Sequence, residues 1–393
     1  MTLARSRTRS RLAFALASAA AVGVVQLGGM SAAQAATTVP SAPSATVGFN
    51  GVVHTVAYGD GVVYVGGDFT AAVTSAGQSI TRNHVAAINE STGQLLAWNP
   101  GADGSVRSVV VANGSVYLGG AFTHAGGATH RRLARVNAVS GAVDNSWNPS
   151  VGGTVRSVAV TAAKVYAGGA FTTAGGQPRT YLAAFSADTG ALDPAWAPVA
   201  NGYVWDVRAA NGWVYAGGEF TTMNGDLHGR FLAALDPVTG ALQPGYNSQV
   251  TYTVFDMVVT PALIYAAADG AGGHLRALNL NGSSRWTLTA DGGVQAVAVV
   301  GDAIYIGGHF DNICTTARNA AAGGACLDGQ VARKKFAAVD ANGVLQGWAP
   351  MANSAHGAWA LAGDPATGRL AAGGEFTTFN NGRIRQPYFA QFG

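Results

Sequence analysis

The stretch Val214-Tyr215-Ala216-Gly217-Gly218-Glu219-Phe220-Thr221 decides the fold, because the chain repeats it along its length. Related copies, most of them keeping the glycine pair and the phenylalanine, stand at 63–70, 119–123, 168–172, 307–310 and 373–377. A degenerate copy at 264–269 has lost both glycines and the phenylalanine. The copies recur about every fifty residues, and an array of this period is typical of a propeller or a solenoid.

Each repeat contains four short runs with the alternation of β-strands. In the fourth repeat, residues 204–209 and 213–216 are joined by Asn211-Gly212, which predicts a hairpin. Residues 231–235 form a third run, and Thr239-Gly240 turns it into a fourth that starts at 241–244. Four antiparallel strands per unit are typical of a propeller blade. The glycine pair should mark a bulge or a close backbone approach.

The two ends of the chain suggest how the array closes. Residues 388–393 match a third strand, which leaves the last unit without a fourth. Residues 46–50 (Thr-Val-Gly-Phe-Asn) resemble 95–99 (Leu-Leu-Ala-Trp-Asn), a fourth run. Pairing the first segment with the last unit would hide two exposed sheet edges. The sequence therefore predicts an all-β, seven-bladed propeller over residues 45–393, closed by an N-terminal strand.

The N-terminal residues predict export. Four arginines, an apolar run from Leu12 to Leu27 and a small-residue site at 33–35 make residues 1–35 a predicted signal peptide. Residues 36–44 are expected to be a linker with nothing to bury. No second apolar stretch of spanning length follows, so no membrane partner is expected after cleavage. Localisation is therefore expected to be secreted and extracellular.

Composition restricts the function classes. Of 393 residues, 55 are glycine and only 11% are charged, which suits short strands joined by tight turns and argues against disorder. Removing the four leader arginines brings the formal net charge from +3 close to neutral. No basic stripe suited to phosphate binding is present, so no nucleic-acid partner is expected. The two cysteines, Cys314 and Cys326, are twelve positions apart in one insertion and predict a local disulfide.

At these residues the chain resembles a known repeat family. Gly-Gly-x-Phe-Thr, a glycine-containing loop, an arginine, a short apolar strand, a Thr-Gly turn and a closing Trp-Asn-Pro are similar to the delta-60 repeat. The resemblance implies a secreted bacterial β-propeller of mostly uncharacterised function, and it covers most of the chain after the leader. It carries no catalytic residue, because none belongs to the repeat as such. Two repeats depart from the pattern, one without the glycines and one with the cysteine-bearing insertion.

Common catalytic signatures are missing from the sequence, including nucleophile elbows, zinc-protease helices, phosphate loops and calcium loops. His124 and His130 share a loop, but a solvated histidine loop is the expectation, so no metal or cofactor is expected. An arginine precedes the third strand in most repeats, as at Arg82, Arg179 and Arg333. These arginines could bridge neighbouring blades or present a ring of charge to an anion, and their recurrence with the scaffold favours a structural role.

The first strand of each blade should line the central channel. Its entry position varies while the scaffold does not, and it holds His54, Arg107, Arg156, Trp205, Phe255, Gln295 and Trp359. Two carboxylates follow directly, Asp206 and Asp256, and three residues lie in the connections just before, Tyr203, Tyr252 and His356. Such a mouth would suit a polar, planar-faced ligand such as a glycan or a peptide. Alternatively, the large side chains only plug the channel.

Two functions follow from this reading. The first is a monomeric extracellular binding or scaffold module for a glycan, a cell-wall polymer or a protein. The second is an enzyme at the channel mouth, a hydrolase or lyase acting on saccharides through Asp206 and Asp256. Catalytic residues cannot be named from the sequence, and the missing motifs favour the binding module over the enzyme.

Overall fold

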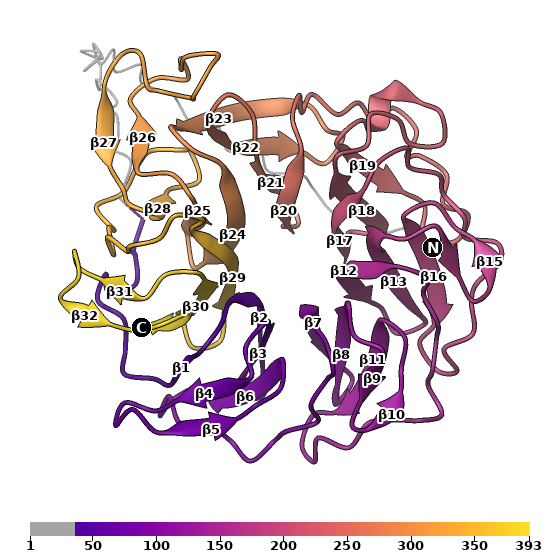
Figure 1. Ribbon diagram of the computed structural model, residues 1–393. Helices are drawn as coiled ribbons and strands as arrows, with labels where there is room; N and C mark the ends of the chain where they lie inside the picture. The colour runs from indigo at the N-terminus through magenta and orange to yellow at the C-terminus, as the bar shows by residue number, and fades with distance from the viewer. Residues whose placement is uncertain (1–35) are drawn as a thin grey trace, which may run out of the picture. The chain divides into compact units, whose positions relative to one another are not determined.

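In the computed structural model, residues 36–393 are described, and they form sheets arranged around a central axis (Figure 1). The predicted signal peptide, residues 1–35, lies outside the described residues. Within 36–393, seven sheets each contain a first, second and third strand in antiparallel order. They are β2 (Val53–Gly59), β3 (Val62–Gly67) and β6 (Val85–Asn89); β7 (Val106–Ala112), β8 (Ser115–Gly120) and β11 (Leu133–Asn137); β12 (Thr154–Val160), β13 (Lys164–Ala170) and β16 (Leu182–Ser186); β17 (Val204–Ala210), β18 (Trp213–Gly218) and β19 (Leu232–Leu235); β20 (Val254–Val259), β21 (Leu263–Ala268) and β22 (Gly273–Asn279); β24 (Val294–Val300), β25 (Ala303–Gly308) and β28 (Phe336–Val339); β29 (Ala358–Asp364), β30 (Arg369–Gly374) and β33 (Phe389–Phe392).

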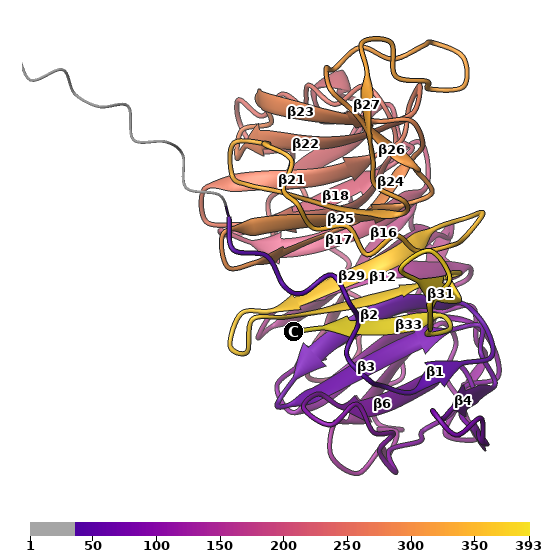
Figure 2. The same cartoon turned by 90° about the vertical axis from the view of Figure 1, so that its left-hand side faces the viewer.

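The first strands of consecutive sheets contact one another around the axis. β2 contacts β7, and the same relation runs through β12, β17, β20, β24 and β29, which contacts β2 in turn. Figure 2, turned by 90°, shows β29 and β33 of the last sheet lying beside β2 and β3 of the first, and β30 also contacts β2. The predicted class, an all-β propeller, is confirmed.

Short strands and a single turn of 3-10 helix fill the connections. They are β1 (Gly48–Phe49), β4 (Ala71–Val73), β5 (Ser79–Thr81), β9 (His124–Ala125), β10 (Ala128–Thr129), β14 (Thr173–Ala174), β15 (Gln177–Pro178), η1 (Leu227–Gly229), β26 (Asn312–Cys314), β27 (Gln330–Ala332), β31 (Thr378–Phe379) and β32 (Ile384–Arg385). Among the described residues no helix is long and apolar enough to cross a membrane.

The hydrophobic core lies between neighbouring sheets rather than within one. Tyr64 and Val85 of the first sheet pack with Val106, Val109 and Leu118 of the second, all of them buried, and the other sheets pair in the same way. The first glycine of each pair makes this packing possible. A Cβ on Gly66 would stand 2.6 Å from a methyl group of Val106. The repeated glycine therefore leaves room for an aliphatic residue of the next blade.

The fourth strand of most blades is shorter than predicted. In most blades it is reduced to a single bridge, such as Ile88 with Leu95 or Phe185 with Leu192. Turn residues and prolines such as Pro194 follow directly, and proline cannot donate to a ladder. The fifth blade, whose run has neither proline nor glycine, forms a full fourth strand, β23 (Ser284–Ala290), paired with β22.

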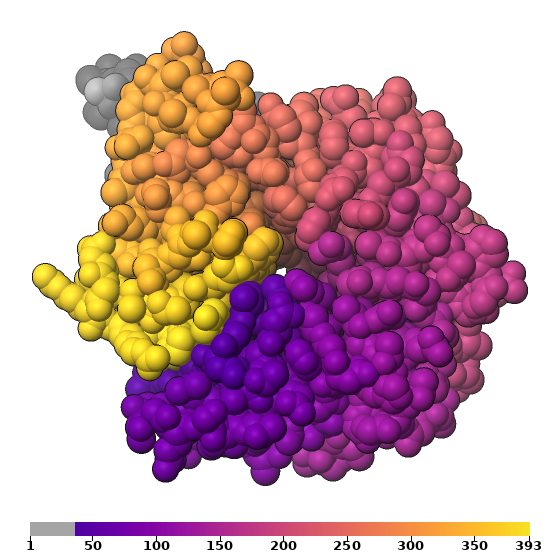
Figure 3. All heavy atoms as spheres, in the orientation of Figure 1, coloured from indigo at the N-terminus to yellow at the C-terminus, as the bar shows by residue number. Residues whose placement is uncertain are grey.

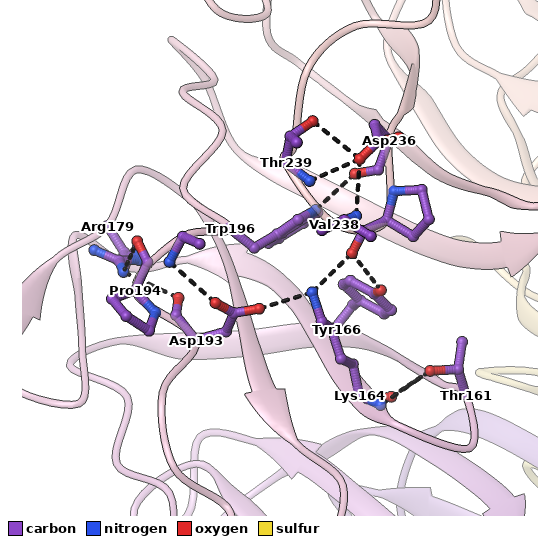
Figure 4. Close-up of polar contacts among 12 residues, drawn as sticks. Thr161, Lys164, Tyr166, Arg179, Asp193, Pro194, Trp196, Asp236, Val238 and Thr239 are labelled. Carbon is purple, nitrogen blue, oxygen red and sulfur yellow. Dashed lines mark hydrogen bonds and ion pairs between the residues drawn. The ribbon is translucent and has the colours of Figure 1, made fainter.

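The closing tryptophan of a repeat ties it to the next blade. Trp196 Nε1 donates to the carbonyl of Asp236, 3.0 Å away at the end of β19. Close by, Lys164 Nζ and Tyr166 Oη of the third blade both donate to the carbonyl of Pro237 (Figure 4). The turn that accepts these bonds is fixed by the Asp236 carboxylate, which accepts from the amide of Thr239. The same indole-to-carbonyl bond recurs at Trp98, Trp147, Trp286 and Trp348.

The predicted register of the N-terminal strand is wrong. Residues 46–50 are not the fourth strand of the last blade, because Gly48 and Phe49 form β1 and pair with Val73 and Ala72 of the first blade. The residue that bridges β33 is Ser44, paired with Gln391. Phe49 stands where later repeats place Ala102, whose bridge to Ala125 is equivalent. The resemblance to a fourth run therefore came from an aromatic residue in the connection between the last blade and the first.

Residues 36–44, expected to bury nothing, are part of the packed structure. Val39 is buried, and its amide donates to the hydroxyl of Tyr305 at 2.8 Å. Trp348 Nε1 donates to the carbonyl of Pro40. In other blades the acceptor of the equivalent indole bond lies at the end of a third strand, as Asp236 does. The segment thus supplies the outer part of the last blade.

Candidate functional site

A β-bulge in each first strand presents the residue at the predicted entry position to the channel. In β2, Val53 pairs with Gly67 and Thr55 with Gly66, which leaves His54 as the extra residue. The register shifts at the same place in the other six first strands. The extra residues are Arg107, Arg156, Trp205, Phe255, Gln295 and Trp359. The predicted entry ring is therefore a ring of bulged residues.

The second glycine of each pair accommodates this bulge. A Cβ on Gly218 would stand 2.1 Å from the carbonyl oxygen of Tyr203, two residues before the bulged Trp205, so a side chain there would force the local backbone to shift. Gly67, Gly120 and Gly169 face equivalent carbonyls at 2.0 to 2.1 Å. The fifth blade keeps its bulge with alanines at 267 and 268, so the glycines accommodate the bulge but do not alone create it.

The seven bulged residues line one central cavity with a volume of about 560 Å³. Figure 3 shows the hollow at the centre of the ring of blades. Further along the axis its wall becomes apolar, with Val111, Val299 and Ala362 among the lining residues. The cavity therefore has a polar, aromatic end and an aliphatic end. The size is within the range of small-molecule pockets.

Arginine and tryptophan stack on one wall of the cavity. The guanidinium carbon of Arg156 lies 3.8 Å from the centroid of the Trp205 ring, a cation–π contact between adjacent blades. Trp205 Nε1 donates to Glu219 at 2.8 Å, and the ring of Phe255 meets Trp205 edge-on at 5.2 Å. Trp205 is thus held from three sides, which fixes its orientation before any ligand arrives.

A second cluster joins the first, second and last blades. His54 Nε2 lies 2.6 Å from Asp68 Oδ2, and Arg107 Nη2 lies 3.7 Å from the same oxygen. The hydrogen bond from His54 holds the pKa of Asp68 well below its usual range, while burial lowers the pKa of His54. An ionised Asp68 beside a neutral His54 follows at neutral pH. Trp359 meets the His54 ring edge-on at 6.3 Å.

The opposite wall carries polar atoms without partners. Gln295 is 8% exposed, yet its Oε1 has no hydrogen-bond partner among the described residues, and the same is true of Trp359 Nε1. Buried polar atoms are normally paired, because an unpaired one costs about 1–3 kcal/mol. Both residues line the cavity. They are available to a ligand or to water.

The family and structure comparisons agree on the architecture. A family model described as a domain of unknown function (DUF5122) β-propeller matches residues 112–146, which run from the end of β7 past β11. The WD40 β-propeller domain of Doa1 is similar to this chain with a TM-score of 0.58 at 13% identity, and the match covers 90% of this chain and 96% of that one. The chain is a repeat β-propeller.

A second solved structure resembles the propeller as well. The computationally designed Ika8 protein matches with a TM-score of 0.50 at 13% identity, over 88% of this chain and 98% of that one. Identity this low shows the fold alone. No curated protein matches the propeller sequence.

The predicted carboxylates, Asp206 and Asp256, reach the cavity but are fully engaged. Arg208 lies between them, with Nε 2.9 Å from Asp206 Oδ2 and Nη2 2.7 Å from Asp256 Oδ1. Asp206 also accepts from the amide of Met257 at 3.0 Å, and Asp256 from the amide of Val297 at 2.8 Å. Burial raises the pKa of Asp256 to about 7, and the neighbouring Asp206 adds to the rise against the opposing charge of Arg208. The two carboxylates join blades, and this geometry does not favour their use in hydrolysis.

The same position joins blades elsewhere in the propeller. The residue after the bulge accepts from a backbone amide of the next blade: Thr55 from Val109 at 3.1 Å, Ser108 from Val158 at 3.0 Å, and Ser157 from Val207 at 3.0 Å. Each first strand is an edge strand of its sheet, so some of its amides have no ladder partner within the sheet and can donate to the neighbouring blade. We call these side chains, with Asp206 and Asp256, the inter-blade belt.

Three predicted site residues lie outside the cavity lining. Tyr203 and Tyr252 are 43% and 40% exposed and contact other rings, Tyr181 edge-on and His274 face to face. His356 is exposed and lies 2.5 Å from Glu375. None of the three is among the residues that line the cavity, and each contacts a side chain from another segment of the chain, so their place at the mouth stays a prediction. Sequence reasoning missed Arg208, which lies in the cavity although no repeat pattern marks it.

The arginines that precede the third strand stabilise their own blades. Arg82 donates to the carbonyls of Thr81 and Leu96, and Arg333 donates to Ala332 and Gln346. Each connects the start of a third strand with the fourth run of the same blade. The structural interpretation holds for them, although the bonds do not cross to a neighbouring blade.

The remaining sequence candidates have local partners. His124 lies 2.9 Å from Asp103, and His130 lies 3.1 Å from Asn145. Within residues 36–393 no three His, Cys, Asp or Glu side chains converge as a metal site would require. The predicted disulfide between Cys314 and Cys326 is formed and closes its own insertion.

Proposed function

We propose that this protein is an exported binding module that takes a saccharide at the polar end of its central cavity. The proposal rests on one observation above the others, that Trp205, Phe255 and Trp359 converge with charged and amide side chains on one cavity. Aromatic faces beside hydrogen-bonding groups suit a ring that is apolar on its faces and polar around its rim.

Two further features support the proposal. The Cys314–Cys326 disulfide suits an oxidising, extracellular compartment, in agreement with the predicted signal peptide. The cavity side chains are held by neighbours, as at Trp205. Ordering them on ligand binding would therefore cost little conformational entropy. The engaged state of Asp206 and Asp256 favours binding without hydrolysis.

The test is a binding screen of the secreted protein against glycans and cell-wall polymers, repeated with Trp205→Ala and Trp359→Ala. Both variants should weaken binding of any ligand found. Trp213→Ala is the matched control, because Trp213 begins β18 at the opposite end of the first-to-second hairpin and does not line the cavity. Unchanged binding by both cavity variants would remove the site, and hydrolysis of a bound glycan would favour the enzyme instead.

A further inference from the structure

Arg156 carries a positive charge that the carboxylate of Glu219 offsets only from beyond ion-pair distance. It makes no ion pair within residues 36–393, and its Nε is buried without a hydrogen-bond partner. Its guanidinium stacks on the face of Trp205. A guanidinium normally satisfies several of its five donors when it is taken out of water. Arg156 therefore has donors available inside the cavity.

Arg107 of the preceding blade adds a second positive charge to the same wall. The two arginines are bulged residues of β7 and β12, which contact each other, and both line the cavity. Burial lowers the pKa of Arg156, and the charge of Arg107 lowers it further. Arg107 has one partner, Asp68, at the long distance of 3.7 Å. Two neighbouring guanidiniums with so little compensating negative charge create a positive potential in this part of the cavity. That potential favours the binding of an anion.

The opposite wall offers hydrogen bonds without charge. Gln295 lies three blades from Arg156 around the ring, and its unpartnered Oε1 can accept from a hydroxyl. Trp359 Nε1, also unpartnered, can donate to one. A ligand that bridges these walls needs an anionic group at one side and hydroxyls at the other.

We propose that Arg107 and Arg156 form a carboxylate subsite, and that the ligand is an acidic saccharide of the uronic-acid type whose hydroxyls meet Gln295 and Trp359. This inference rests on the proposed function and names the substrate class of the same site. A singly charged, planar carboxylate matches the guanidinium fork. Asp68 and Glu219, which act on the two arginines, would repel a doubly charged phosphate more strongly than a singly charged carboxylate.

The test compares charged and neutral forms of the same sugar. The probes are trimers of galacturonate and mannuronate and short hyaluronan oligomers, each beside its carboxyl-reduced counterpart, with calorimetry on the full secreted chain. At least one acid should bind about tenfold tighter than its reduced form, the size of one charge-assisted hydrogen bond. Arg156→Gln should weaken binding of the acid much more than binding of the neutral form, and so abolish that preference. Arg156→Lys, which keeps the charge, should retain part of the preference.

Arg230→Gln is the control, because Arg230 is exposed and outside the cavity lining. Thermal unfolding of every variant shows that it is folded. If acid and reduced forms bind equally, or only neutral glycans bind, the carboxylate subsite is wrong while the saccharide-binding function stands. If sugar phosphates bind more tightly than uronates, the choice of carboxylate is overturned. If no saccharide binds at all, both proposals fail together.

Discussion

Trp348 Nε1 donates a hydrogen bond to the carbonyl oxygen of Pro40, 308 positions earlier in the chain, at 3.2 Å. In other blades the same indole bond reaches the end of the third strand of the following sheet, as from Trp196 to Asp236. In the last blade the carbonyl of Gly393, directly after β33, accepts from the hydroxyl of Ser44 instead. Residues 36–44 thus bond both to the end of β33 and to Trp348, and they connect the last blade with the one before it.

Removing residues 36–44 should lower the stability of the propeller. A chain starting at residue 45 loses the burial of Val39, worth about 1.5–3 kcal/mol, and the bonds to Tyr305 and Trp348, each worth about 0.5–1.5 kcal/mol. We expect a loss of about 2.5–6 kcal/mol in the free energy of unfolding, measured with denaturant against a chain starting at residue 36.

Tyr305→Phe tests whether the loss of stability comes from the hydrogen bond between the Val39 amide and the Tyr305 hydroxyl, and not from shortening the chain as such. In the chain that starts at 36 the substitution removes the acceptor of the Val39 amide, so it should destabilise. In the chain that starts at 45 that amide is already absent, and the substitution should cost less. Equal costs in both chains would contradict the proposed role of the segment.

Much of the fold and of the cavity ring could be predicted, because the repeat encodes them locally. The glycine pair lies opposite the bulge on the paired strand, and counting back along the hairpin identifies the bulged residue, as Gly218 does for Trp205. A position that varies within a constant scaffold is therefore visible as a candidate site. The prediction needed no knowledge of how blades pack.

The rest depends on contacts between distant residues, which no single repeat records. Phe49 looks like a closing aromatic residue, but its ring packs on Phe69 at 4.2 Å and fixes a different register. Asp206 and Asp256 looked like free carboxylates, because nothing in the sequence shows that Arg208 lies between them. Side-chain partners of this kind are set by the packing of blades, so only coordinates reveal them.

Gly218→Ala should destabilise the propeller by about 1–3 kcal/mol, because the added methyl group would meet the carbonyl of Tyr203 at 2.1 Å and the bulge would have to shift. Thermal unfolding measures the effect. Gly347→Ala is the control, since a Cβ there meets nothing within 4 Å and the backbone is not left-handed. A tolerated alanine at 218 would show that the close approach does not explain the glycine pair.

Ser157→Ala tests the inter-blade belt. The change leaves the buried amide of Val207 without its acceptor and removes a donor to Asp206, so a loss of about 1–3 kcal/mol is expected in denaturant unfolding. Ser150→Ala, at an exposed serine, should have almost no effect. If both variants unfold at the same midpoint as the parent, water replaces the hydroxyl and the belt contributes little.

The Asp206–Arg208–Asp256 triad should make stability depend on pH. The pKa of Asp256 is raised to about 7 in the folded protein, mainly by burial, against roughly 3.9 in an unfolded chain. Between these values the folded state keeps a proton that the unfolded state releases. The stability contributed by this group is therefore complete below about pH 4, and it declines as the pH rises towards 7.

Asp256→Asn should remove this dependence. The amide oxygen can still accept from Val297, and the side chain stays neutral at every pH in this range. We therefore expect the free energy of unfolding of the parent, relative to that of the variant, to fall steadily between about pH 4.5 and 7.5. Over this interval the folded parent keeps the Asp256 proton that the unfolded chain releases. Asp302→Asn, at an exposed carboxylate outside the triad, controls for general effects of charge. A difference between parent and Asp256→Asn that stays constant with pH would show that Arg208 keeps Asp256 ionised throughout, because its charge then outweighs the cost of burial.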